Sequence, residues 1–153
     1  MLNRTHIAFS LFLGLLFFKF SNNPLIFFIV LIVSTFLPDL DSYNSKIGKR
    51  FFSRVLTAFT KHRGIMHSLL FFLGAYFLLY FYIPILSFGF FVGYGGHLFG
   101  DLITKRGLRL FYPFKFRIHG FLKTGGRLES VLFLIFVLLD VFLIFGLVIE
   151  NIF

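Results

Sequence analysis

Five apolar stretches, separated by short polar breaks, constrain the fold of this chain more than any other feature. They run over residues 7–20, 24–37, 69–83, 85–99 and 131–149. Such stretches predict helices, and a chain with 58% hydrophobic residues has too little polar surface to cover a water-soluble globule of 153 residues. We therefore expect an all-α integral membrane protein, with about five transmembrane or membrane-embedded helices in a single domain over residues 1–153.

The breaks between the stretches carry turn residues. Asn23-Pro24 divides the first two stretches and Pro84 divides the next two. Because proline interrupts one helix and starts the next one well, both breaks predict tight hairpins. Only the last stretch approaches the roughly 20 residues that span a hydrocarbon core. The first two form either a spanning or a shallow re-entrant pair, and both alternatives return the chain to the side from which it came.

The basic residues predict an orientation. When the stretches are threaded through a membrane, fourteen of the fifteen lysines and arginines fall on one side and Lys19 alone falls on the other. The positive-inside rule places the richer side in the cytoplasm. We expect a protein integral to the cell membrane, with its N-terminus cytoplasmic and its C-terminus outside. Membrane lipids already account for the positive charge, so we do not expect nucleic acid as a partner.

Two long connections lie on the predicted cytoplasmic side. In the first, apolar residues recur at helical spacing over 47–59 with basic residues largely opposite, which predicts one amphipathic interfacial helix. The second, residues 104–128, alternates apolar and basic residues over 114–118 and contains glycine turns. That pattern predicts a short interfacial strand or hairpin.

Nine of the eleven histidines and acidic residues stand where an apolar stretch begins or ends, and the threading brings all nine to the cytoplasmic face. They are His6, Asp39, Asp41, His62, His67, His97, Asp101, His119 and Glu129. Side chains that bind metals or move protons are costly near hydrocarbon, so their gathering at one depth indicates a site. The chain has no cysteine, and a metal must therefore bind through nitrogen and oxygen.

The sharpest local pattern is His97 followed by Asp101. A step of four places both side chains on one face of a helix, where they can bind one divalent ion. A hydrogen-bonded structural pair is the alternative. Gly89 and Gly93 share this ridge, with further glycines beside it, so neighbouring helices can approach the ligand face closely.

Two further patterns complete the candidate site. His62 lies in the segment that enters the third helix and His67 in its first turn, so both can converge on one ion with Arg63 nearby. Asp39 and Asp41 end the second helix, where carboxylates oppose the helix dipole. An ordinary role as helix-terminal polar residues is therefore a weaker explanation for them than usual.

These residues, in this order, resemble the YdjM-like family of membrane-bound metal-dependent hydrolases. The resemblance rests on His6, the Leu-Pro-Asp-Leu-Asp block at 37–41, His62-Arg63-Gly64 with His67-Ser68-Leu69-Leu70, Gly93 with His97 and Asp101, Pro113, and Gly-Arg-Leu-Glu at 126–129. It implies an integral membrane protein with a metal-dependent hydrolase site, remotely similar to the helical zinc-dependent phospholipase C enzymes. The chain departs from the family at Ile65-Met66, where an aromatic residue and a threonine are common.

The hypothesis that follows is hydrolysis of a phosphoester, on a lipid headgroup or polyprenyl carrier at the cytoplasmic interface. One or two divalent ions, with zinc favoured over manganese or iron, would bind to His6, Asp39, Asp41, His62, His67, His97 and Asp101. Glu129 would act as base or further ligand, and Asp41 as a bridging carboxylate. Arg63 would clamp a phosphate oxygen, while Lys123 and Arg127 would attract the headgroup.

Two other functions stay open on the sequence alone. A metal or ion transporter or channel would use the same cluster as a binding station, with Asp140 lining a path outward. A non-catalytic membrane scaffold would use a structural metal to hold helix ends together. A hydrolase is favoured because the cluster offers more candidate ligands than the four that close a structural site. We leave His119 out of the ligand set as an interfacial residue, and interpret Asp140 as a buried group that is either protonated or hydrogen-bonded.

Overall fold

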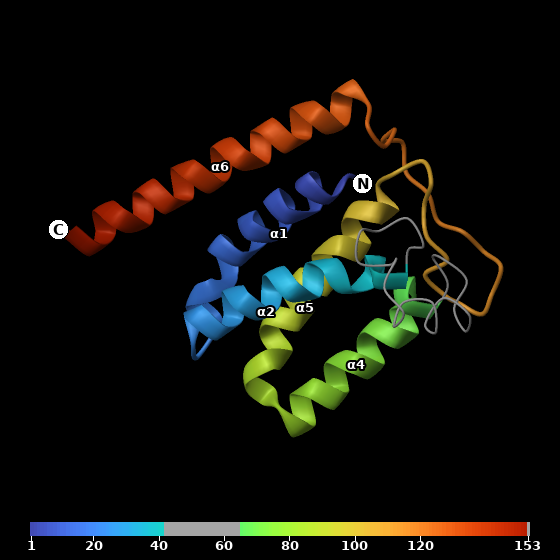
Figure 1. Ribbon diagram of the computed structural model, residues 1–153, viewed down its shortest axis with the longest axis horizontal. Helices are drawn as coiled ribbons and strands as arrows, with labels where there is room; N and C mark the ends of the chain where they lie inside the picture. The colour runs from blue at the N-terminus through green and yellow to red at the C-terminus, as the bar shows by residue number, and fades with distance from the viewer. Residues whose placement is uncertain (42–64, 153) are drawn as a thin grey trace.

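The computed structural model describes residues 1–41 and 65–152, and this part of the chain is all-helical (Figure 1). Its helices are α1 (Asn3–Phe17), α2 (Pro24–Phe36), α4 (Leu69–Tyr82), α5 (Pro84–Leu102) and α6 (Arg127–Ile152), with 3-10 turns η1 (Phe18–Phe20), η2 (Leu37–Asp41) and η3 (Ile65–His67). All five predicted helices are confirmed, with ends within four residues of those expected. The amphipathic helix predicted over 47–59 lies outside the described residues.

Polar caps and prolines set the helix ends as the sequence predicts. The Asn23 side chain accepts a hydrogen bond from the Ile26 backbone N–H at 3.1 Å, and Pro24 fills the first position of α2. Ile83 ends α4, and Pro84 starts α5 directly after it. Both predicted hairpins are therefore confirmed.

Helix α5 is the centre of the bundle and packs against α1, α2 and α4. Its glycines make this possible. A Cβ on Gly93 would lie 2.2 Å from the carbonyl oxygen of Leu31 in α2, and a Cβ on Gly100 would lie 3.0 Å from Nδ1 of His6 in α1. The first contact is closer than a real Cβ comes and the second is tighter than most, so α2 and α1 lie this close to α5 because these positions lack a Cβ. The prediction that small residues give neighbouring helices close access is confirmed.

Two buried apolar clusters hold α5 in this position. Between α4 and α5, the buried ring of Tyr94 stacks on Phe72 with centroids 5.7 Å apart. Between α2 and α5, Phe27 and Leu31 pack against Val92. Close packing on both sides fixes the rotation of α5, and therefore the direction in which its polar residues point.

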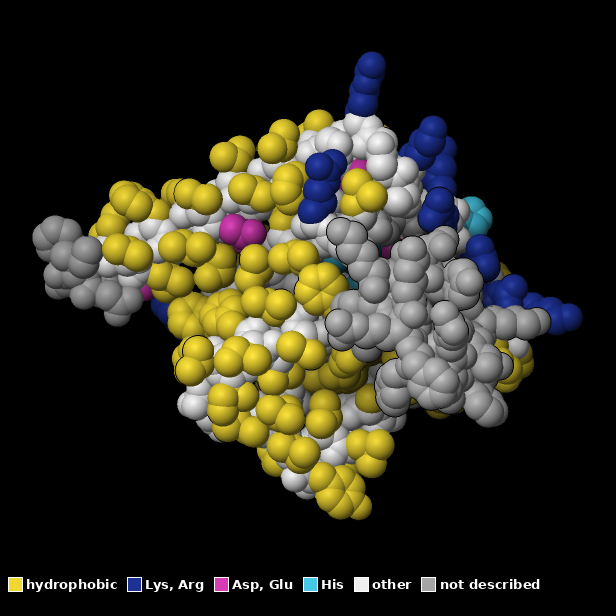
Figure 2. Space-filling view, in the orientation of Figure 1, with side chains coloured by type: hydrophobic (Ala, Val, Ile, Leu, Met, Phe, Trp, Pro, Cys, Tyr) yellow, Lys and Arg dark blue, Asp and Glu magenta, His cyan; other side chains and the backbone are white. Residues whose placement is uncertain are grey.

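Helix α6 runs parallel to α1 along the outside of the bundle (Figure 1). The two helices meet at one end through Leu2 and Glu129, and at the other through Lys19 and Glu150, whose Nζ and Oε2 atoms lie 3.3 Å apart. Over Arg127–Glu150 the mean hydropathy reaches 3.1 and little of the helix is buried. Among the described residues, α6 is the one helix long and apolar enough to cross a membrane, by length and composition. The expectation from stretch lengths is confirmed, and Figure 2 shows apolar side chains covering this helix and most of the visible face.

The connection from α5 to α6 corrects one of the two alternatives expected there, the strand. It contains no strand, but the chain folds back on itself so that Leu108 and Ile118 pair at an isolated antiparallel bridge, and Thr104 pairs with Leu122 at a second isolated bridge. The physical reason is that turns fill the segment between the bridges, so the alternating residues at 114–118 have no continuous partner strand. Leu108 and Leu122 are buried and hold this loop against the bundle.

Candidate metal centre

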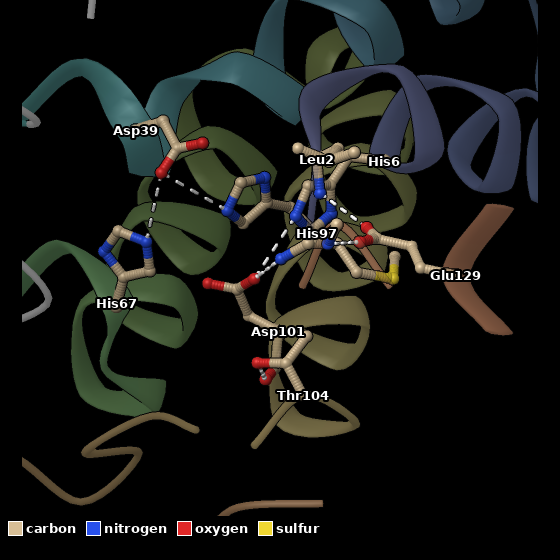
Figure 3. Close-up of polar contacts among 10 residues, drawn as sticks. Leu2, His6, Asp39, His67, His97, Asp101, Thr104 and Glu129 are labelled. Atoms are coloured by element: carbon tan, nitrogen blue, oxygen red, sulfur yellow. Dashed lines mark hydrogen bonds and ion pairs between the residues drawn. The ribbon is translucent and has the colours of Figure 1, made fainter. Parts of the chain in front are cut away.

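Five of the predicted site residues converge at one end of the bundle (Figure 3). They come from four elements: His6 from α1, Asp39 from η2, His67 from η3, and His97 with Asp101 from α5. Their nitrogen and oxygen atoms form two groups of three that share His97. Within each group, one donor atom from each of the three residues lies within 4.8 Å of the other two.

The first group is His6, His97 and Asp101. His6 Nε2 lies 3.3 Å from Asp101 Oδ1, and the rings of His6 and His97 stack with centroids 4.0 Å apart and planes 10° from parallel. The step of four along α5 places His97 and Asp101 together as predicted. Gly100 between them lets α1 approach closely enough for His6 to join.

The second group is Asp39, His67 and His97. Asp39 Oδ1 lies 3.6 Å from His67 Nε2 and 3.9 Å from His97 Nε2. The two imidazole rings meet edge-on with centroids 5.6 Å apart. This group links the end of α2 to the start of α4 through a residue of α5, so three helices must pack correctly before it forms.

The side chains of the two groups are largely buried, and several of their polar atoms make no hydrogen bond in the part of the chain that the structure describes. The three histidines and Asp101 are almost fully buried, while Asp39 keeps 27% of its side chain exposed. His6 Nε2 already faces Asp101 Oδ1 at 3.3 Å, but His6 Nδ1 and both ring nitrogens of His97 make no hydrogen bond within the described residues. A buried polar atom without a partner costs about 1–3 kcal/mol, and a bound cation would supply the missing bond.

Asp39 is charged at neutral pH, as a metal ligand must be. Burial raises the pKa of this carboxyl, but the hydrogen bond from His67 and the positive potential of His97 outweigh that effect. The result is a pKa lowered from 3.8 to about 2.

Residues around the two groups hold the ligands in place. The Tyr94 hydroxyl donates a hydrogen bond to the Met66 carbonyl, next to His67. Ser68 caps α4 by accepting from the Phe71 backbone N–H at 3.2 Å. We did not predict either residue. Ser68 carries a recognisable signal, a serine directly before an apolar run. Tyr94 carries none, because its contact depends on how α5 packs against η3.

Glu129 lies outside both groups. Its carboxylate oxygens accept hydrogen bonds from the backbone N–H groups of Leu2, at 2.6 Å, and Gly125. The amino group of Met1 pairs with Asp101 beside it. Glu129 therefore fastens the start of α1 to the start of α6, and this placement favours a positioning role over that of a base.

The remaining candidates are placed as follows. Lys123 and Arg127 are exposed just before and at the start of α6. His62, Arg63 and the side chain of Asp41 lie outside the described part of the chain, so their predicted roles stay predictions. Two residues set aside on the sequence also lie outside both groups: His119 is exposed, and Asp140 is buried in α6. No hydrogen-bond partner is found among the described residues for Asp140 Oδ1.

Comparison with known proteins gives the family context. The family model described as YdjM inner membrane protein matches residues 1–152 of this chain. The uncharacterized protein YvsG of Bacillus subtilis (strain 168) is 35% identical over 105 residues. That match covers 65% of this chain and 66% of YvsG, just under two thirds of the relative's length. No solved structure matches the chain.

Proposed function

The chain belongs to the YdjM inner membrane protein family, and from this premise we propose that it is a membrane-bound metal-dependent hydrolase. Its substrate is a phosphoester of a lipid headgroup or polyprenyl carrier at the cytoplasmic interface. One observation carries the proposal: two groups of histidine and aspartate donors share His97 at one end of the bundle.

The donor set fits a catalytic metal. Three protein ligands with an open fourth position are typical of catalytic zinc sites, whereas structural sites use four. Each group supplies three, and His97, whose ring nitrogens make no hydrogen bond within the described residues, belongs to both groups. Mixed imidazole and carboxylate ligands favour zinc, with manganese or iron next. One ion in either group would have three of these ligands, whereas ions in both groups at once would need His97 to bridge them as an imidazolate or His62 and Asp41, the further proposed ligands, to complete one of the sites.

When bound by these residues, a divalent ion would supply Lewis acidity for activating water and polarising the phosphoryl oxygens. The chain supplies position and proton transfer. Asp39 is the most exposed of the five ligands, so water and substrate arrive on its side. The water oxygen attacks phosphorus, the bond from phosphorus to the alcohol oxygen breaks, and the water proton reaches the departing oxygen. Asp41 is the proposed proton acceptor and Arg63 the proposed phosphate clamp.

Charge supports an anionic substrate at this end. Of the nine lysines and arginines whose side chains the structure describes, all but Lys19 lie in α1's first turn, in residues 103–126 or at the start of α6. Figure 2 shows most of the visible ones gathered near this end. By the positive-inside rule this end faces the cytoplasm, with the N-terminus inside. Lys123 and Arg127 are the proposed headgroup contacts.

Elemental analysis of protein purified in detergent without chelator tests the proposal. We expect one or two divalent ions per chain in the wild type, and loss of bound metal in His97→Ala, because His97 serves both groups. His119→Ala and Asp140→Asn are matched controls that should keep the metal, since neither residue belongs to a group. The same samples are then assayed for alcohol or phosphate release from phospholipids and polyprenyl phosphates.

The outcomes separate the alternatives. Metal loss and loss of hydrolysis together in His97→Ala support the hydrolase. A wild type without bound metal contradicts the proposal. Bound metal whose removal unfolds the chain, with no ester cleaved, identifies a structural site in a scaffold. Metal uptake into vesicles without hydrolysis identifies a transporter.

A further inference from the structure

An apolar groove runs along α5 beside the metal centre. Its volume is about 370 Å³, and it is lined by Phe9, Leu13, Phe17, Phe72, Phe91, Val92, Gly95, Gly96 and Phe99. Three helices form it: α1 and α5 supply most of the walls and α4 contributes Phe72. The groove shares no residue with either donor group.

Glycines keep the groove open. A Cβ on Gly95 would lie 3.3 Å from the end of the Phe72 ring, and a Cβ on Gly96 would lie 3.3 Å from both Leu13 Cδ1 and Ser10 Oγ. A larger residue at either position would extend into the groove or press on its wall. The outer rings of Phe17 and Phe99 remain 42% and 55% exposed, so the groove opens sideways toward the surroundings of the bundle.

One end of the groove meets the metal centre through the chain itself. Phe9 follows His6 by one turn of α1, and Gly96 directly precedes His97 in α5. Phe9 and Phe99 line the groove at this end, and their rings stack with centroids 6.0 Å apart. From Phe9 to Phe17 the wall extends by about 12 Å along α1, away from the metal end. A chain in the groove would therefore reach from the donor groups toward the middle of the membrane.

We propose that this groove binds one hydrocarbon chain of a single-chain or polyprenyl phosphate lipid and delivers its phosphate to the metal centre. Two properties of the site match a lipid: its walls suit an apolar tail, and the positive charge at one end suits an anionic head. The walls are apolar for their whole length, and the lysines and arginines gather at the end where the anionic head would lie. The proposal rests on the proposed function for the chemistry at the head, and it adds the recognition of the tail.

The test uses hexadecyl phosphate with a photoreactive diazirine near the end of its chain, added to the full protein in detergent. Cross-links should concentrate on groove residues such as Phe17 and Phe91. Hexadecyl phosphate should compete, and ethyl phosphate should not. Gly95→Leu should reduce labelling by at least about tenfold, since an added side chain fills the groove. Gly95→Ala adds one carbon against the movable ring of Phe72 and should reduce labelling by less. This variant provides the test if Gly95→Leu fails to fold.

Gly74→Leu is the matched control. It places the same side chain on α4 where a Cβ meets nothing within 4 Å, so labelling should stay at the wild-type level. Labelling spread evenly over the exposed face of α6, or unchanged in both Gly95 variants, overturns the groove proposal. A second result also overturns the proposal: the lipid probe does not label the groove, and Gly95→Leu changes the oligomeric state of the protein. The groove would then bind a second copy of the chain.

Failure of the groove and failure of the hydrolase are distinguishable. A wild type labelled in the groove that cleaves no ester keeps the tail site and removes the proposed chemistry. A wild type that cleaves long-chain and short-chain phosphoesters equally, without groove labelling, keeps the chemistry and removes the tail site.

Discussion

Replacing Gly93 with alanine should disturb the candidate metal centre, although residue 93 supplies no ligand atom. The alanine Cβ would lie 2.2 Å from the Leu31 carbonyl oxygen and 2.3 Å from Ser34 Oγ. The hydroxyl can rotate away, but the carbonyl belongs to the backbone of α2. To restore an ordinary contact, α2 has to retreat from α5 by roughly 1 Å, and such overpacking costs about 1–3 kcal/mol.

The retreat also moves Asp39. This ligand follows α2 directly in η2, and its carboxylate already lies 3.9 Å from His97 Nε2. Functional ligands have to be held within about 0.5 Å of their productive positions, so a shift of this size should weaken metal binding by at least about tenfold. The loss should appear although Gly93 has no side chain and supplies no ligand atom.

Thermal unfolding in detergent, followed by circular dichroism, and metal titration of stripped protein measure both effects. Gly74→Ala is the control: its Cβ meets open space, and alanine gains up to about 1 kcal/mol of helix propensity over glycine. We expect Gly93→Ala to be less stable than wild type and Gly74→Ala to be equal or more stable. A Gly93→Ala protein with wild-type stability and full metal affinity would refute the argument that glycine packing sets the ligand geometry.

Two further predictions concern residues around the ligands. Glu129→Gln turns an amide N–H₂ toward a backbone N–H that now donates to a carboxylate, so it should lower stability by about 1–3 kcal/mol, measured by the same unfolding assay. Loss of turnover with unchanged stability would instead identify Glu129 as a base. Tyr94→Phe keeps the ring packing but removes the hydrogen bond to the Met66 carbonyl, which should cost about 1 kcal/mol and weaken metal binding through His67. Unchanged metal affinity in Tyr94→Phe would mean that this hydroxyl does not position His67.

Much of the candidate centre follows from local sequence patterns. The step of four between His97 and Asp101 fixes their common face on any α-helix. The hairpins at Asn23-Pro24 and Pro84 return the chain twice to the same end, which is why Asp39 and His67 lie near His6 and His97. These relations depend on helix geometry and the positions of helix ends, and both can be read without knowing how the helices pack.

Other features depend on contacts between distant parts of the chain. The sequence predicts Glu129 as a base or further ligand, and only the structure shows that its oxygens accept hydrogen bonds from two backbone N–H groups. The alternation at 114–118 suggested a strand or hairpin, and the loop forms isolated bridges without a strand because its turns leave no partner strand. Neither result has a local signal, since each depends on which backbone groups the folded chain brings within reach.

The sequence by itself determined that this chain forms apolar helices whose polar residues collect at one end. The helical repeat and the cost of placing charge in hydrocarbon both depend on residues close together in the sequence, so both can be read from local patterns. Tertiary structure alone decided that His97 serves two groups and that an apolar groove opens beside them. Both depend on the rotation and separation of α1, α2, α4 and α5, which are set by close packing at a few glycines and not by any single helix.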